Sequence, residues 1–299
     1  MWRWCLALTL GLSSILEASC VQLRSNETDP IDKWLDMHKP KIFFAAGFEG
    51  SGIVIFQRLW KSSFVWNDDS KQHVLKFPQD WICGVHWAFH GYDVMKSRVA
   101  TIKVNDVYAL PFQATYPSCG VRTDDHEHRL KHYHPDLLWI QQASADSEVS
   151  DRIIFINRPL VDCLKLTCMV RHYETCDNQV KTLSNNAKIL KQQLLDIDRS
   201  TASCYDYPSD AAVSAEVAKV FGNGLPSMNY WFEERNISHI DSILGVSAAD
   251  LKGLADLTKQ LNDICHKMHK FTMEHYKTMI DRGHGDIRLL RTAEPTILY

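Results

Sequence analysis

The sequence has no CxxC motif and no cysteine–histidine spacing of the kind that binds structural zinc, so we expect no structural zinc site. It has no excess of charge: the formal net charge is −3, which gives no global reason to expect nucleic acid or an anionic membrane surface as a partner. Internal repeats and low-complexity tracts are also absent. The hydrophobic fraction of 45% and the charged fraction of 23% are those of an ordinary globular protein. Any anion-binding site must therefore be local.

Long apolar stretches are scarce, and the one at the N-terminus has the pattern of a signal peptide. Arg3 precedes an apolar stretch over residues 5–16, and small residues at 18–20 form a plausible cleavage site. The stretch is shorter than the roughly 20 residues that a membrane-spanning helix needs. We interpret residues 1–20 as a cleaved signal peptide. The alternative is the uncleaved anchor of a Golgi type II protein, which alone would attach the chain to a membrane.

Glycosylation sequons and cysteines also fit a secretory route. Sequons begin at Asn26 and Asn236. The chain has 9 cysteines, and cleavage after residue 20 would remove Cys5 and Cys20. The number left is odd, so one cysteine would stay free or form a disulfide between chains. In an oxidising lumen we expect roughly one to three disulfides. The two candidate partners for Cys168 are Cys176 and Cys204.

Residues 41–60 read as a strand, a glycine-rich turn and a helix. The run from Ile42 to Ala46 is short and apolar, as in a strand buried on both faces. The turn from Gly47 to Gly52 can curl so that backbone N–H groups and the helix N-terminus face an anion. The alternative is a tight turn that binds nothing. Beyond it, apolar residues recur at helical spacing: Ile53, Val54, Phe56, Leu59 and Trp60.

A second apolar run, residues 153–156, is followed at once by Asn157 and Arg158. Open α/β sheets bind ligands beyond the carboxyl ends of their strands. The arginine fork suits such a place because it donates two parallel hydrogen bonds to an anionic oxygen pair. We therefore favour a binding role for Arg158. The alternative is a surface arginine paired with Asp162.

The order of elements predicts an α/β fold with a three-layer arrangement, in which helices cover both faces of a parallel sheet. We expect a short helix near Leu137, which follows Pro135, and a further strand at residues 204–207. Ser247 and Asp250 form a capping pair before a long helix whose apolar stripe runs to Phe271. We divide the chain into residues 1–20 (signal peptide), 21–39 (irregular), 40–222 (α/β domain) and 223–299 (C-terminal helical extension packed on the same domain).

Histidines gather at two places. His86 and His90 are four residues apart and would share a helix face, as a metal pair does, although aromatic packing explains them without a third ligand. His126 and His128, with more histidines close behind, could bind metal or move protons near neutral pH. The alternative for this second group is a solvated loop beside a site.

Together, these elements resemble a divergent sulfotransferase of the P-loop fold. In that family the glycine-bearing turn binds the 5′-phosphosulfate of 3′-phosphoadenosine 5′-phosphosulfate (PAPS), and residues 48–52 stand at that turn. A later strand of the family ends in an arginine that binds the 3′-phosphate, followed by proline and aspartate. Arg158, Pro159 and Asp162 match this motif, although the proline comes one place early. The family's Pro-Asp-Leu helix start is matched at residues 135–137.

The chain departs from the family at the positions that handle charge. Gly50 stands where active members carry lysine or arginine, and Ile53 and Val54 replace the hydroxyl residues. The serine expected after the arginine is Leu166, with Thr167 one place on. Losing one donor that stabilises the transition state typically costs on the order of 10²–10³ in rate.

The resemblance implies a PAPS-dependent transferase of the Golgi lumen or the secreted fraction, acting on a hydroxyl of a carbohydrate or another luminal acceptor without metal or nucleic acid. A protein that keeps the fold but acts as a secreted or luminal binding module is the alternative. An ATP- or GTP-hydrolysing protein fits poorly, because the turn lacks the Gly-Lys-Ser/Thr ending. The implied general bases are Glu49, His126 and His128. The implied PAPS-binding residues are Phe48, Glu49, Gly50, Ser51, Gly52, Ile53, Val54, Arg158 and Thr167.

Overall fold

The computed structural model describes residues 28–53, 55–56, 59, 92–102, 107–109, 114–116, 118–121, 131–133, 136–170, 176–222 and 245–284. Several predictions fall outside these residues: the signal peptide, both sequons, Val54, and the histidines at 86, 90, 126 and 128.

The centre of the fold is a six-stranded sheet with the order β2-β1-β6-β7-β8, in which β3 also pairs with β1. Every pairing in this sheet is parallel, which confirms the predicted α/β class. Its strands are β1 (Lys41–Phe48), β2 (Val107–Ala109), β3 (Ala114–Tyr116), β6 (Ser150–Asn157), β7 (Ala202–Asp206) and β8 (His269–Lys270). A separate antiparallel pair consists of β4 (Ser118–Val121) and β5 (Lys131–Tyr133).

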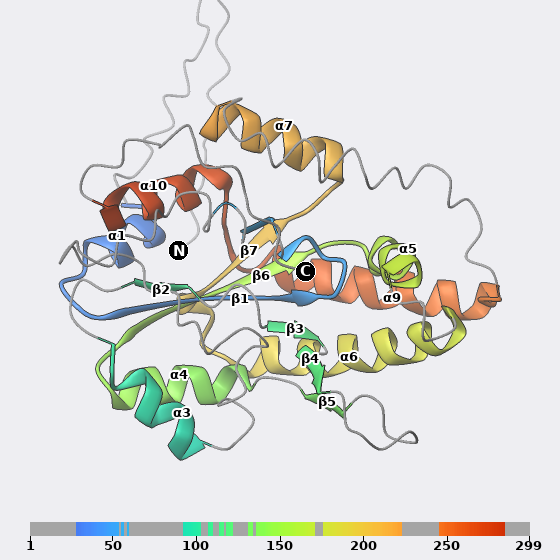
Figure 1. Cartoon of the computed structure of the whole chain (residues 1–299), viewed down its shortest axis with the longest axis horizontal. Coiled ribbons are helices and arrows are strands. Elements are labelled where there is room, and N and C mark those ends of the chain that lie inside the picture. The colour runs from blue at the N-terminus through green and yellow to red at the C-terminus, as the bar shows by residue number, and fades with distance from the viewer. Residues whose placement is uncertain are drawn as a thin grey trace, which may run out of the picture.

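Helices cover both faces of the sheet, as predicted. Figure 1 shows α1, α7 and α10 above the sheet and α3, α4 and α6 below it. The helices are α1 (Pro30–Asp36), α3 (Tyr92–Val99), α4 (Leu137–Asp146), α5 (Leu160–Val170), α6 (Cys176–Asp196), α7 (Asp210–Phe221), α9 (Ala248–Cys265) and α10 (Met273–His284), with a short 3₁₀ turn at Arg199–Thr201. None of the described helices is long and apolar enough to cross a membrane.

The two central strands confirm the apolar runs seen in the sequence. All of β1 is buried, and so is β6 after its first residue. Strands covered on both faces read as continuous rather than alternating apolar runs, because neither face meets water. The interior of the sheet is therefore well predicted from local composition.

The C-terminal segment is part of this core, and the predicted helix reaching Phe271 is wrong. Helix α9 ends at Cys265, and β8 then pairs with β7. Phe271 is 1% exposed and packs beside Phe43 at a ring-centroid distance of 5.8 Å. The hydroxyl of the buried Tyr276 donates to the Phe56 carbonyl (2.7 Å). Residues 248–279 thus complete the core of the α/β domain.

The N-terminal segment predicted to be irregular contains helix α1. Asp29 caps the helix, since its carboxylate accepts a 2.7 Å hydrogen bond from the Ile31 N–H, and Pro30 stands in the first helical turn. Ile31 and Trp34 are buried, and the Trp34 indole donates to the Ser150 carbonyl. A helix this short offers only two buried side chains, too few for a visible period.

Two disulfides are present among the described cysteines. Cys168 pairs with Cys176, as one of the two predicted options has it. The other option is wrong, because Cys204 pairs with Cys265 (Cα–Cα 5.4 Å). Cys163 is free and buried, and burial raises the pKa of its thiol to about 12, so it stays a neutral packing group.

Candidate functional site

The parallel strands β1, β6 and β7 end at one edge of the sheet, and the predicted glycine turn and Arg158 directly follow the first two. In register, Ala46 of β1 lies beside Phe155 of β6, and Asn157 of β6 lies beside Asp206 of β7. The glycine turn after β1 and Arg158 after β6 therefore emerge side by side. The predicted meeting of these two segments at one sheet edge is present.

The glycine turn is held by close packing on both sides. Gly50 and Gly52 have φ angles of 81° and 91°, in the left-handed region. A Cβ on Gly50 would lie 2.8 Å from the Cys163 carbonyl oxygen of α5, and one on Gly52 would lie 2.1 Å from the Tyr207 ring. Position 50 thus has no room for the basic side chain that the sulfotransferase family carries there. The turn can offer an anion its backbone but no cation of its own.

We expect Gly52→Ala to lower the free energy of unfolding by about 2–3 kcal/mol, because it combines left-handed backbone strain with overpacking against Tyr207. Chemical denaturation measures the loss. Gly253→Ala is the matched control: Gly253 lies within α9 with nothing near its Cβ position, so alanine should stabilise the protein by about 0.5–1 kcal/mol. Equal effects of the two substitutions would contradict this packing.

Arg158 is almost fully buried and is already paired. Its guanidinium donates two hydrogen bonds to Asp210, at 2.9 and 3.2 Å, and lies 4.5 Å from the Tyr207 ring centroid. Burial alone would lower the pKa of Arg158, but Tyr207 and Asp210 outweigh it, so the pKa is raised and the group stays charged. The alternative pairing with Asp162 is wrong, because Asp162 instead lies 3.7 Å from Lys165. Arg158 is therefore not a surface arginine.

Tyr207 fills the space between Arg158 and the glycine turn. Its ring is 1% exposed and contacts both Gly52 and the guanidinium, while its hydroxyl donates to Asp210 (2.6 Å). This arrangement is not a preformed pocket for a doubly phosphorylated nucleotide. An anion reaches the Arg158 fork only when Tyr207 and Asp210 move aside.

The other predicted site residues that the structure describes differ in their burial and hydrogen bonding. Thr167 is buried, and its hydroxyl lies 3.1 and 3.0 Å from the Cys163 and Leu164 carbonyls of its own helix, so its proton is directed to the backbone. Ile53 packs in the hydrophobic core, and Glu49 is half-buried at the turn. Neither Thr167 nor Ile53 presents a polar group to the sheet edge.

Two buried donors at this edge have no hydrogen-bond partner within the described part of the chain: the Ser51 hydroxyl and the Arg158 Nε–H. Buried polar groups in native proteins nearly always have partners, and an exception calls for an explanation such as a ligand or water. Ser51 belongs to the predicted turn and Arg158 to the predicted arginine motif. Five buried side-chain groups elsewhere in the described residues also lack a partner, so the two unpaired donors are compatible with an anion here but do not by themselves identify one.

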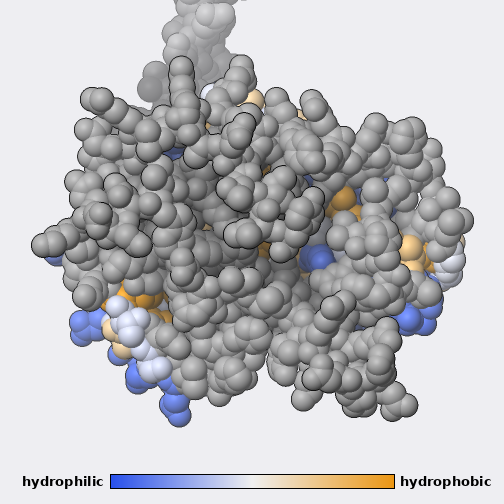
Figure 2. Space-filling model, viewed as in Figure 1, coloured by the Kyte–Doolittle hydropathy of each residue, from blue (hydrophilic) through white to orange (hydrophobic). Residues whose placement is uncertain are grey.

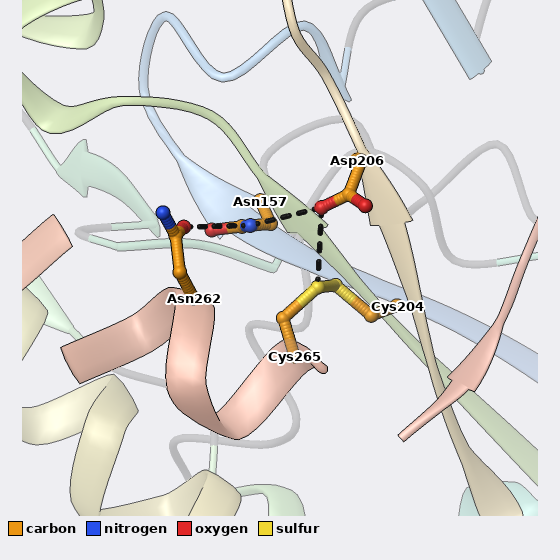
Figure 3. Close-up of a disulfide and its surroundings, with 5 residues drawn as sticks. All are labelled: Asn157, Cys204, Asp206, Asn262 and Cys265. Carbon is orange, nitrogen blue, oxygen red and sulfur yellow. Dashed lines mark hydrogen bonds between the residues drawn. A yellow bond between two sulfur atoms is a disulfide. The ribbon is translucent and has the colours of Figure 1, made fainter. Parts of the chain in front are cut away.

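A polar network fixes the same strand ends from the side of α9 (Figure 3). Asn157 donates from Nδ2 to Asp206 (3.1 Å) and to Asn262 (2.9 Å). The Cys265 sulfur lies 3.3 Å from Asp206 Oδ1. In the disulfide with Cys204 this sulfur has no hydrogen to donate, so the approach is a contact rather than a hydrogen bond. The network joins β6, β7 and α9.

Sequence reasoning missed Tyr207 and Asp210. Tyr207 directly precedes Pro208 at the end of a predicted strand and Asp210 lies two residues after it, so the rule that pointed to Arg158 would have pointed to them as well. Their pairing with Arg158 could not be read from the chain, because Asp210 is 52 residues further on.

No protein-family model, no curated protein and no solved structure matches this chain. The resemblance to sulfotransferases therefore depends on the motifs and on the order of the elements.

Proposed function

We propose that the chain is a sulfotransferase-like protein of the secretory pathway, which takes PAPS as co-substrate and transfers its sulfuryl group to a hydroxyl of a carbohydrate or another luminal acceptor. The observation that supports this most directly is the position of Arg158: it follows β6, the neighbour of β1, and so stands beside the glycine turn. Two sequence features of the N-terminal segment, its apolar stretch and its small-residue cleavage site, agree with a secretory address, as do the two disulfides.

In this proposal the backbone of residues 48–52 and the start of the following helix hold the 5′-phosphosulfate. Arg158 holds the 3′-phosphate once Tyr207 and Asp210 have moved aside. The Ser51 hydroxyl and the Arg158 Nε–H supply further donors. Of the three candidate bases, Glu49 lies among the residues that the structure describes, and its position at the turn suits it to take the acceptor proton. The transfer is in-line and needs no metal.

A binding module that has lost the chemistry is the second candidate function. Two observations favour it: the absence of space for a cation at Gly50, and the Tyr207 ring beside Gly52. A protein with these features could hold a sulfated or phosphorylated ligand without stabilising charge on a leaving phosphate.

Nucleotide binding tests the proposal. We expect 3′-phosphoadenosine 5′-phosphate to raise the Tm of the purified protein, because a ligand at 100 times its Kd stabilises the native state by about 2.7 kcal/mol. Adenosine 5′-monophosphate, which lacks the 3′-phosphate, should give a much smaller shift. Arg158→Lys keeps the charge but loses the fork, so it should weaken binding by about tenfold or more.

Sulfate transfer from PAPS to carbohydrate acceptors then separates the two candidates. Binding with transfer that Arg158→Lys reduces supports the transferase, whereas binding without transfer supports the binding module. A protein that gains no stability from the nucleotide would contradict the transferase.

A further inference from the structure

Three side chains from distant segments converge near the amino end of β7, whereas Arg158 lies beyond the carboxyl end of β6. Asp29 caps α1, His269 belongs to β8, and His275 lies in the first turn of α10. Asp29 Oδ2 is 3.1 Å from His269 Nε2 and 3.3 Å from His275 Nε2. The three ligand atoms all lie within 4.8 Å of one another, and the side chains are 20–31% exposed, so solvent ions can reach them.

We propose that Asp29, His269 and His275 bind a zinc ion. Bonds of about 2.0–2.1 Å to imidazole nitrogen and carboxylate oxygen place neighbouring ligand atoms of a tetrahedral zinc roughly 3.3 Å apart. The distances from Asp29 Oδ2 to the two imidazole nitrogens match that spacing without movement of the backbone. Two imidazoles and one carboxylate suit Zn²⁺, and a water molecule would take the fourth position.

The surroundings orient these ligands. The second oxygen of Asp29 accepts the Ile31 N–H, which fixes the carboxylate. The Nδ1 atom of His275 lies 3.1 Å from the Thr272 hydroxyl, which can accept its proton when Nε2 binds metal.

One hydrogen bond of the structure disfavours zinc binding by His275. The Thr272 backbone N–H lies 3.0 Å from His275 Nδ1 and donates to it, which leaves the ring proton on Nε2, facing Asp29. Zinc binding moves that proton to Nδ1 and loses this bond. Thr272 Oγ1 still accepts from the His275 backbone N–H, so α10 keeps its cap. One lost hydrogen bond is a small cost beside three metal–ligand bonds.

The ion would join α1 to β8 and α10, and thus the first described helix to the last. This binding would be independent of the proposed transferase site. The sequence does not reveal the site, because Asp29 and His269 are 240 residues apart and have no local ligand spacing. The expectation of no metal came from local spacing alone.

Titration of the EDTA-treated full-length protein with ZnCl₂ tests the site, with calorimetry for affinity and thermal unfolding for stability. We expect binding of one ion at this site and a rise in Tm. His269→Gln and Asp29→Asn should each weaken this binding by at least about tenfold. Asparagine is as good a helix cap as aspartate, so Asp29→Asn tests the ligand while α1 keeps its cap.

His266→Gln is the matched control. His266 is exposed and lies three residues before His269, and it is not part of the cluster. The control matters because the chain has 14 histidines, any of which can bind zinc weakly. Binding that is kept in His266→Gln but weakened in the two ligand variants supports the site. Binding that is equal in all four proteins, or absent from the wild type, overturns it.

Discussion

Replacing Asp210 with alanine is expected to lower the free energy of unfolding by about 3–4 kcal/mol, because removing one partner of a buried ion pair leaves the other charge uncompensated. Breaking a buried ion pair typically costs about 3–5 kcal/mol. Arg158 is 5% exposed but Asp210 is 23% exposed, so water partly screens this pair and we expect a loss toward the lower end of that range. The substitution also removes the acceptor of the Tyr207 hydroxyl. Urea denaturation of both proteins measures the difference.

Asp177→Ala is the control for this prediction. Asp177 also lies in the first turn of its helix, α6, and also pairs with a basic residue, Lys181, at 2.7 Å. That pair is exposed, with side-chain exposures of 69% and 43%, so its loss should cost less than about 1 kcal/mol. Similar losses at the two positions would show that Asp210 acts through the helix N-terminus rather than through Arg158.

The parts of the fold that local composition determines were predictable. The apolar runs that became β1 and β6 are short, uninterrupted and bounded by turns, as strands covered on both faces must be. The capping pair before α9 was also correct: the Ser247 hydroxyl accepts the Asp250 N–H (3.1 Å). In each case the residues that decide the structure are neighbours in sequence.

The errors arose where tertiary pairing overrides a local pattern. The apolar spacing of α9 continues through Met268 to Phe271, and no glycine or proline marks the end of the helix at Cys265. Pairing of β8 with β7 draws the backbone out of the helix there. A periodic pattern identifies the buried side chains correctly but cannot tell whether a helix or a strand delivers them.

Arg158 shows the same limit within the candidate site. Asp162, four residues away, was the natural partner by sequence distance, yet Arg158 precedes α5 and faces α7 instead. The partner is set by the position of β7 beside β6, which brings Tyr207 and Asp210 to the edge where Arg158 emerges. Sheet order, which no local pattern specifies, therefore decides whether this arginine is free to bind an anion.

The disulfide between Cys204 and Cys265 is expected to contribute more stability than that between Cys168 and Cys176. The two bonds close loops with sequence separations of 61 and 8 residues. Loop-closure entropy then predicts losses of roughly 4 kcal/mol for the Cys204→Ala/Cys265→Ala double variant and roughly 2.5 kcal/mol for Cys168→Ala/Cys176→Ala. Chemical denaturation without reductant measures both losses.

A reductant provides the control, since it should bring the wild-type protein close to the stability of the Cys204→Ala/Cys265→Ala variant or below it, while affecting that variant less. The effect should extend to the candidate site. Cys265 touches Asp206, whose carboxylate also accepts from Asn157, the residue directly before Arg158. If the Cys168→Ala/Cys176→Ala variant were the less stable of the two, loop length would not determine how much stability each disulfide contributes. The disulfide that attaches α9 to β7 would then not be the main covalent support of this edge of the sheet.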